Sequence, residues 1–80
     1  MRVTVTIDRR PEIADPEGTT VERALHDLGF VEAKSVRMDR VIHMEVEGDD
    51  AAQVKARVED MCRQLLANPV LEDFSVEVGT

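Results

Sequence analysis

The stretch that decides the fold runs from Met61 to Phe74 and reads MCRQLLANPVLEDF. It is typical of an amphipathic helix that ends at Asn68-Pro69 and passes directly into a strand, because proline disfavours helical geometry at the residue before it. Upstream, Asp50 can cap this helix, and downstream Val70 to Val78 alternates as a last strand. The apolar stripe of the helix comprises Val54, Val58, Met61, Cys62 and Leu65, and the inner face of the strand comprises Phe74, Val76 and Val78.

Alternation of apolar and polar residues predicts three further strands. The first lies at the N-terminus, the second covers roughly Ala33 to Met38, and the third covers Arg40 to Glu47, with a tight connection at Asp39-Arg40. Their inward-facing residues are Val3, Val5 and Ile7, then Val36 and Met38, then Ile42, Met44 and Val46.

A loop from Arg9 to Gly18 should lead into the first helix, and its glycine can adopt a positive φ. Thr19 and Glu22 fit a capping box, in which each side chain bonds the other residue's backbone N–H. We therefore expect a helix from about Thr20 to Leu28, ended by Gly29 in the left-handed conformation. Its apolar face comprises Val21, Ala24, Leu25 and Leu28.

The element order predicts an α+β fold of the ferredoxin-like kind, a split βαβ (βαββαβ) sandwich in a single domain of residues 1–80. We expect a four-stranded antiparallel sheet in the order 4-1-3-2, with both helices on one face. The other face should stay open, either solvated or in contact with another subunit. Its residues are Thr4, Thr6, Val41, His43, Glu45, Ser75 and Glu77.

Size and charge exclude several functions. Eighty residues bury a thin core, so oligomerisation or docking on a larger partner should support the fold. A net charge of −7 with only two aromatic residues argues against nucleic acid as a partner. No apolar run approaches the ~20 residues of a membrane span. The single cysteine and the absence of a signal-peptide pattern favour the cytoplasm.

No residue pattern predicts an active site. His26 and His43 are expected at the surface and lack metal-ligand neighbours at suitable spacing. Cys62 falls on the apolar stripe of its helix, so we expect it to pack in the core rather than react. The acidic residues should be solvated or cap helices, and the loop at Asp15-Pro16-Glu17-Gly18 lacks the glycine and lysine spacing of a phosphate-binding loop.

Several segments, in order along the chain, resemble the PurS family, the small subunit of phosphoribosylformylglycinamidine synthase. Each segment is short, but their order and separations together are specific. They are Pro11-Glu12-Ile13, Asp15-Pro16, Gly18, Ala24-Leu25, Leu28-Gly29, Val36-Arg37, Arg40, Glu45-Val46-Glu47, Leu65-Leu66-Ala67-Asn68, Val70 and Glu72-Asp73-Phe74.

The resemblance implies a subunit with no active site, cofactor or metal of its own. It would join the glutaminase PurQ to the synthetase PurL and help ammonia pass between them. PurL would use ATP and Mg to convert formylglycinamide ribonucleotide to the amidine. The alternative is a small-molecule-sensing regulatory domain of similar fold. The residues expected to meet partners are Asp15, Pro16, Glu17, Gly18, Arg37, Arg40, Asn68 and Pro69.

Overall fold

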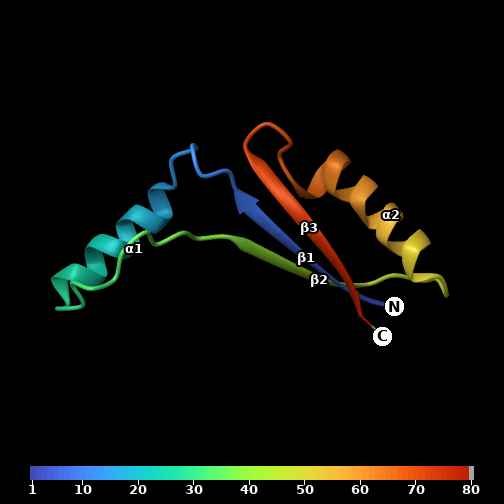
Figure 1. The fold of residues 1–80 in the computed structure, drawn as a ribbon, viewed down its shortest axis with the longest axis horizontal. Coiled ribbons are helices and arrows are strands. Elements are labelled where there is room, and N and C mark those ends of the chain that lie inside the picture. Colours follow the sequence, from blue (N-terminus) through green and yellow to red (C-terminus); the bar gives the residue numbers. More distant parts are fainter. Residues whose placement is uncertain (80) are drawn as a thin grey trace.

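A computed structural model describes residues 1–79 as an elongated arch (Figure 1). The strands stand in the order β2-β1-β3, and β1 pairs antiparallel with both neighbours. The α+β class is therefore confirmed. The elements are β1 (Arg2–Arg9), α1 (Pro16–Asp27), β2 (Arg40–Glu45), α2 (Ala51–Met61), a π-helical turn η1 (Cys62–Leu66) and β3 (Glu72–Gly79).

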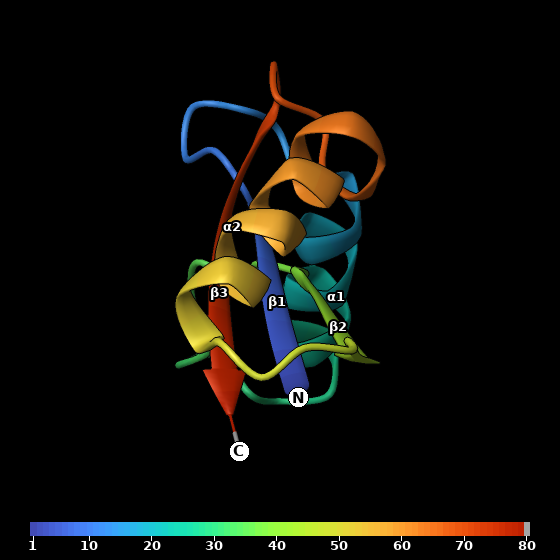
Figure 2. The ribbon, with the colours of Figure 1, turned by 90° about the vertical axis from the view of Figure 1, so that its right-hand side faces the viewer.

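The inner sheet face is apolar, as the alternation predicts. β1 supplies its centre, since Val3, Val5 and Ile7 are at most 1% exposed. Helix α2 covers this face with Val54 and Val58, and Figure 2 shows the helix in front of β1 and β3 while β2 lies to one side. The core is thus a single layer of side chains between α2 and two of the three strands.

The predicted strand from Ala33 to Met38 is wrong, and so is the tight strand connection after it. Side chains of the α1 region bind the backbone N–H groups that a strand would offer to a neighbour. Glu22 Oε1 accepts from Val36 N at 3.1 Å, and Asp15 Oδ2 accepts from Met38 N at 2.8 Å. Ser35 also has a φ of 55°, which interrupts extended geometry. In residues 1–79 the sheet therefore has three strands.

The predicted start of the first helix is also wrong, because the helix begins one turn earlier. Asp15 is the N-cap and accepts from Gly18 N at 3.0 Å, while Pro16 occupies the first turn, where its missing N–H costs nothing. Glu22, expected in a capping box with Thr19, instead binds Val36. Asp15 rather than Thr19 caps the helix, because a carboxylate is a stronger hydrogen-bond acceptor than a hydroxyl group.

Gly18 does not have the positive φ that the loop prediction requires, since it lies inside α1. Its lack of a side chain has another cause: a Cβ there would lie 2.3 Å from the carbonyl oxygen of Val36. The left-handed glycine is Gly29, at φ 102°, as predicted. Gly29 N donates to His26 O at 3.0 Å and Phe30 N donates to Leu25 O at 2.9 Å, the two bonds of a Schellman cap.

The second helix has the predicted cap and an unpredicted end. Asp50 Oδ1 accepts from Ala52 N at 2.9 Å and from Gln53 N at 3.4 Å, which confirms the cap. At the other end Ala67 N donates to Cys62 O at 3.0 Å, closing a π-helical turn that inserts one extra residue. The extra residue rotates Leu65 out of the apolar stripe, and it is 83% exposed.

Helix α1 does not cover the sheet, so the prediction of both helices on one face is wrong for the single chain. Figure 1 shows α1 beyond one end of the strands, and the chain measures 49 × 27 × 14 Å. Its radius of gyration is 16.0 Å, against about 12 Å for a compact chain of this length. Helix α1 and the β2 edge of the sheet therefore lack the covering layer that a compact domain provides.

Candidate functional site

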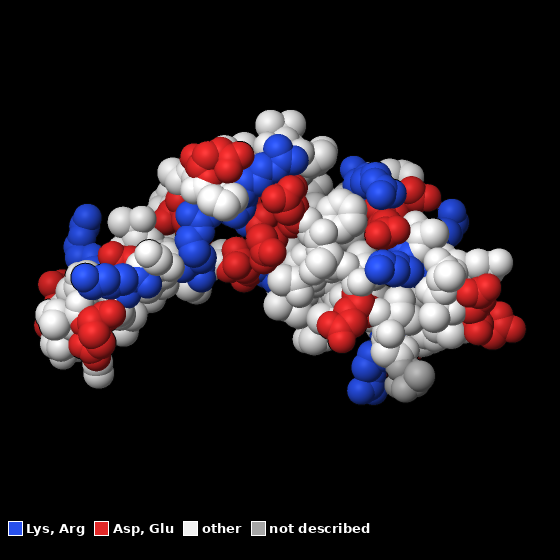
Figure 3. All heavy atoms as spheres, in the orientation of Figure 1, with Lys and Arg blue, Asp and Glu red and all other residues white. Residues whose placement is uncertain are grey.

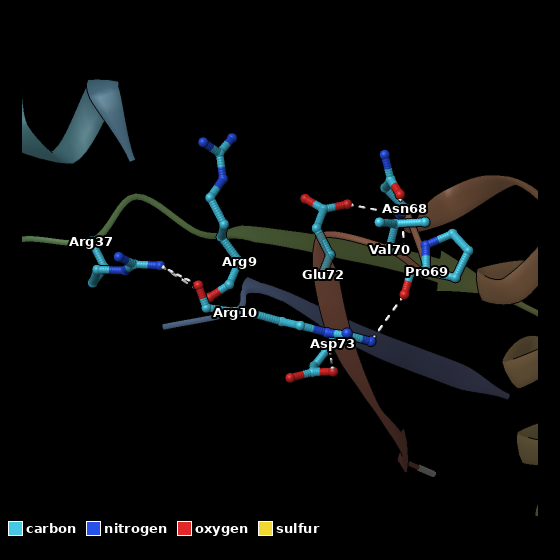
Figure 4. A network of polar contacts seen from close by, with 8 residues as sticks. All are labelled: Arg9, Arg10, Arg37, Asn68, Pro69, Val70, Glu72 and Asp73. Atoms are coloured by element: carbon cyan, nitrogen blue, oxygen red, sulfur yellow. Dashed lines mark hydrogen bonds and ion pairs between the residues drawn. The ribbon is translucent and has the colours of Figure 1, made fainter. Parts of the chain in front are cut away.

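The three segments expected to meet partners converge at one end of the sheet, which we call the sheet-end junction. It lies where β1 ends and where β2 and β3 begin, on the crown of the arch (Figure 4). Figure 3 shows basic and acidic side chains side by side over this crown. The junction comprises Arg9, Arg10, Arg37, Arg40, Asn68, Pro69, Glu72 and Asp73.

Arg37 joins the segment before β2 to the end of β1. Its Nη2 donates to the carbonyl oxygens of Arg9 and Arg10, both at 3.1 Å. Arg10 in turn joins the end of β1 to the start of β3, because its Nη2 donates to Pro69 O at 2.9 Å and its Nε to Asp73 Oδ1 at 3.2 Å. Two guanidinium groups thus hold together the segment before β2, the end of β1 and the start of β3 (Figure 4).

Arg40 and Glu72 form the second link of the junction. Arg40 Nη2 lies 2.8 Å from Glu72 Oε1 and 3.0 Å from Oε2. Glu72 Oε1 also accepts from Asn68 N at 2.9 Å, and Asn68 Oδ1 accepts from Val70 N at 3.0 Å. The Glu72 side chain is only 14% exposed. This carboxylate therefore fixes the turn from η1 into β3, and the Asn68 side chain shapes that turn locally.

Asp15 belongs to the internal structure rather than to an exposed surface. Its carboxylate is buried and accepts from the backbone N–H groups of Met38 and Gly18. These bonds, the Met38 bond foremost, lower the pKa of Asp15 below its ordinary value, and the nearby Arg9 and Arg37 lower it further. The charged form of Asp15 is therefore the one that holds α1 against the segment before β2.

The predicted partner-contact residues thus divide into two groups. Asp15, Gly18 and Arg37 already have internal contacts, and Arg40 is paired with Glu72. The remaining four, Pro16, Glu17, Asn68 and Pro69, are exposed, although Asn68 Oδ1 also accepts from Val70 N and Pro69 O from Arg10. Sequence reasoning missed Arg9, Arg10, Glu72 and Asp73 as members of the junction. Their signal in the sequence was only a charge at the end or start of a strand.

The outer edge of the junction carries a group of carboxylates. Asp8 lies opposite Asp73 in the register of β1 and β3, and Asp39 lies close to Asp8. Desolvation by its neighbours, then the charges of Asp39 and Asp73, raise the pKa of Asp8 above its ordinary value. Arg10 offsets this repulsion through its ion pair with Asp73. The crown therefore presents both charge signs in close alternation.

The other candidate reactive residues have structural surroundings. Cys62 is fully buried in the core, as predicted, and burial raises the pKa of its thiol. His26 Nε2 lies 2.6 Å from Ala33 O, and exposed His43 lies 3.4 Å from Thr4 Oγ1.

Within residues 1–79, no cluster of three or more His, Cys, Asp or Glu side chains could hold a metal ion. No helix in that range has the length and apolar character to cross a membrane. The hydrogen bonds of the sheet-end junction join segments that are distant in the sequence.

Comparison with known proteins identifies similar chains over nearly the full length. The PurS family, described as phosphoribosylformylglycinamidine (FGAM) synthase, matches residues 2–80. The chain is 42% identical over 77 residues to phosphoribosylformylglycinamidine synthase subunit PurS of Methanocaldococcus jannaschii, covering 96% of this chain and 93% of the relative. The Bacillus subtilis subunit is 34% identical, with 96% and 90% covered.

Solved structures agree with these sequence matches. The M. jannaschii PurS crystal structure has a TM-score of 0.91 and 39% identity, covering 99% of this chain and 95% of that one. A chain in the structure of PurLQS from Thermotoga maritima has a TM-score of 0.87 and 32% identity, covering 95% and 93%. The extended arrangement, with α1 away from the sheet, is thus shared with experimentally determined chains.

Proposed function

The chain belongs to the PurS family, and from that premise we propose that it is the small non-catalytic subunit of phosphoribosylformylglycinamidine synthase, in purine biosynthesis. The full-length match over residues 2–80 carries this conclusion. The described residues agree with it, since the one cysteine is buried and the junction arginines are engaged in structural contacts. The regulatory-sensor alternative is not favoured, because all the relatives reported above are synthase subunits.

The proposed partners are the synthetase PurL and the glutaminase PurQ. The PurLQS structure from T. maritima, whose PurS-like chain matches 95% of this one, supports this assignment. In this proposal PurQ releases ammonia and PurL uses that ammonia together with ATP and Mg. This chain itself binds neither ATP nor Mg. Holding the two sites together raises the effective concentration of ammonia at the second one.

The surface proposed to meet these partners comprises the exposed residues Pro16 and Glu17 at the start of α1 and Asn68 and Pro69 at the sheet-end junction. These residues are exposed, and the segments that carry them are fastened by bonds from Arg10 to the Pro69 carbonyl and from Arg9 to the Ala14 carbonyl. A rigid surface loses little conformational entropy on binding, which favours affinity. We place the assembled enzyme in the cytoplasm, where a free Cys62 stays reduced.

Self-association is the third part of the proposal. The radius of gyration of 16.0 Å and the uncovered α1 support it, because an isolated chain of this shape leaves much apolar surface in water. A chain this short has a thin core, and a second copy of it can supply the layer that covers α1. Light scattering on the isolated protein should give a mass of at least two chains.

Product formation from formylglycinamide ribonucleotide tests the proposal. With glutamine as the nitrogen donor, purified PurL and PurQ should convert formylglycinamide ribonucleotide to the amidine only when this chain is added, whereas high ammonium should bypass the need. Equal glutamine-dependent rates with and without the chain contradict the subunit role. Glu17→Lys should lower the glutamine-dependent rate by reversing the charge at the start of α1, and Glu47→Lys, at an exposed position two residues after β2, is the matched control.

A further inference from the structure

The surface proposed to meet partners has two halves that are far apart in the sequence. The first, which we call the helix half, is Pro16 and Glu17 in the first turn of α1. The second, which we call the turn half, is Asn68 and Pro69 in the turn before β3. All four residues are exposed, and neither half belongs to the sheet. Partner subunits can engage both halves at once only where other contacts fix their separation.

Two neighbouring arginines at the end of β1 each reach one half. Arg9 Nη1 donates to Ala14 O at 2.7 Å, two residues before the helix half. Arg10 Nη2 donates to Pro69 O at 2.9 Å, and its backbone N donates to Leu71 O at 2.9 Å. Figure 4 shows the Arg10 side chain extended toward Pro69. The Arg9-Arg10 peptide therefore connects the two halves of the surface.

Arg37 fixes this peptide from the segment before β2. Its Nη2 donates to the carbonyl oxygens of Arg9 and Arg10, both at 3.1 Å, and its Nη1 lies 3.5 Å from Ile13 O. A carbonyl oxygen can accept two hydrogen bonds, and Arg10 O accepts its second from Ile13 N at 2.9 Å. Because one nitrogen makes both short bonds of Arg37, these bonds do not require the planar fork of a guanidinium group.

The acceptors of these arginines indicate that they place the backbone. The chain offers 17 Asp and Glu residues for 10 Lys and Arg, yet Arg9, Arg10 and Arg37 all donate to backbone carbonyls. An ion pair between two side chains leaves the backbone of a loop free to move, whereas a charged donor on a carbonyl holds the segment itself. The three contacts therefore determine where the loops on either side of β1 stand.

We propose that Arg37 is a positioning residue of the assembled synthase. Its hold on the Arg9-Arg10 peptide sets the helix half relative to the turn half, so that partner subunits engage both halves together. The proposal rests on the subunit role and the surface proposed above, and it names the residue that fixes the geometry of that surface. Two segments held in place before binding lose less conformational entropy than two independent ones. Arg37 acts through the Arg9-Arg10 peptide and not by touching a partner.

Distances between spin labels on the isolated chain test the positioning. The labels are attached at Arg23→Cys on α1 and at Val70→Cys beside the turn half, both exposed positions, while Cys62 is buried. Excess unlabelled chain confines the signal to pairs within one chain. Arg37→Ala should broaden the distance distribution, and Arg37→Lys, which keeps a cationic donor on a long side chain, should leave it narrow. Arg57→Ala, at an exposed position on α2, is the matched control. A distribution as narrow in Arg37→Ala as in the unmodified chain overturns the proposal.

The glutamine-dependent synthase assay gives the second readout, in which the chain is titrated against fixed PurL and PurQ. Arg37→Ala should raise the concentration of the chain that gives half the maximal rate by about tenfold, with the same rate at saturation. Arg37→Lys should recover most of this loss. All variants are assayed well below their melting temperatures, so that unfolded chain does not imitate weaker binding.

The two readouts together separate positioning from direct contact. A raised half-maximal concentration without a broadened distance distribution means that Arg37 itself touches a partner, and it overturns the positioning role. A broadened distribution with an unchanged half-maximal concentration overturns it as well. Failure of the unmodified chain to support the glutamine-dependent rate refutes the subunit role instead, and the distance measurement on the isolated chain does not depend on that role.

Discussion

Gly18→Ala is the sharpest test of how α1 is held against the rest of the chain. The added Cβ would lie 2.3 Å from the carbonyl oxygen of Val36 and 2.7 Å from Asp15 Oδ2. Contacts of this kind below 3.0 Å are essentially never seen, so the Val36 carbonyl must retreat by about 0.7 Å. That carbonyl is backbone, and moving it pulls Met38 N away from the Asp15 carboxylate.

Two opposing effects set the magnitude. Inserting a methyl group into a filled space costs about 1–3 kcal/mol. Alanine is favoured over glycine inside a helix by up to about 1 kcal/mol, which offsets part of that cost. We expect the free energy of unfolding to fall by about 1–2 kcal/mol. For a chain of this size the melting temperature should then fall by about 4–16 °C.

Thermal unfolding followed by circular dichroism measures this change, with all chains at equal concentration because dimerisation shifts the melting temperature. Gly79→Ala is the matched control, since a Cβ there lies an ordinary 3.7 Å from Arg2 O. It should change the melting temperature little. A Gly18→Ala protein at least as stable as the unmodified chain would refute the close contact, because the helix preference of alanine offsets at most about 1 kcal/mol of its cost.

Three further predictions address the core, the cap and the activity. Cys62→Ser should cost about 1–3 kcal/mol by burying a hydroxyl, and native Cys62 should react slowly with thiol reagents; rapid labelling of folded protein contradicts its burial. Asp15 has a lowered pKa, so its contribution to stability is complete above the unfolded pKa and disappears as the pH falls through the folded pKa, which lies below the ordinary value of an aspartate. Asp15→Asn should therefore be less stable at neutral pH and lose less on acidification, and identical acid profiles of the melting temperature argue against this role. The isolated chain should hydrolyse neither ATP nor glutamine, and a turnover that survives repeated purification refutes the non-catalytic assignment.

The candidate site was predictable in its parts but not in its assembly. The segments around Asp15, Arg37 and Asn68 were identified from their residues, and the structure brings all three to one end of the sheet. Their convergence depends on two long-range contacts. Arg10 bonds Pro69, more than fifty residues away in the sequence, and Glu72 bonds Arg40, more than thirty residues away. A charged residue at a strand end has many possible partners, and only the folded chain selects one.

The sequence by itself determined the local features. Periodicity established which faces of β1, β2 and β3 are apolar, and Asp50 and Gly29 marked helix ends, because these signals depend on neighbours within a few residues. It also predicted the family through short segments in order along the chain.

Only the tertiary structure decided what each face meets. Residues 33–38 alternate like a strand. However, Glu22 and Asp15 accept from the N–H groups of Val36 and Met38, which are then not free to pair with a neighbouring strand. Gly18 is required by a carbonyl eighteen residues away, not by its own φ. The residues of the predicted apolar stripe lie on or next to α1, but Ala24 and Leu28 of this stripe are exposed, since a stripe states only that something must cover it. Hydrophobic burial is not directional, so periodicity does not distinguish a sheet of the same chain from that of another copy.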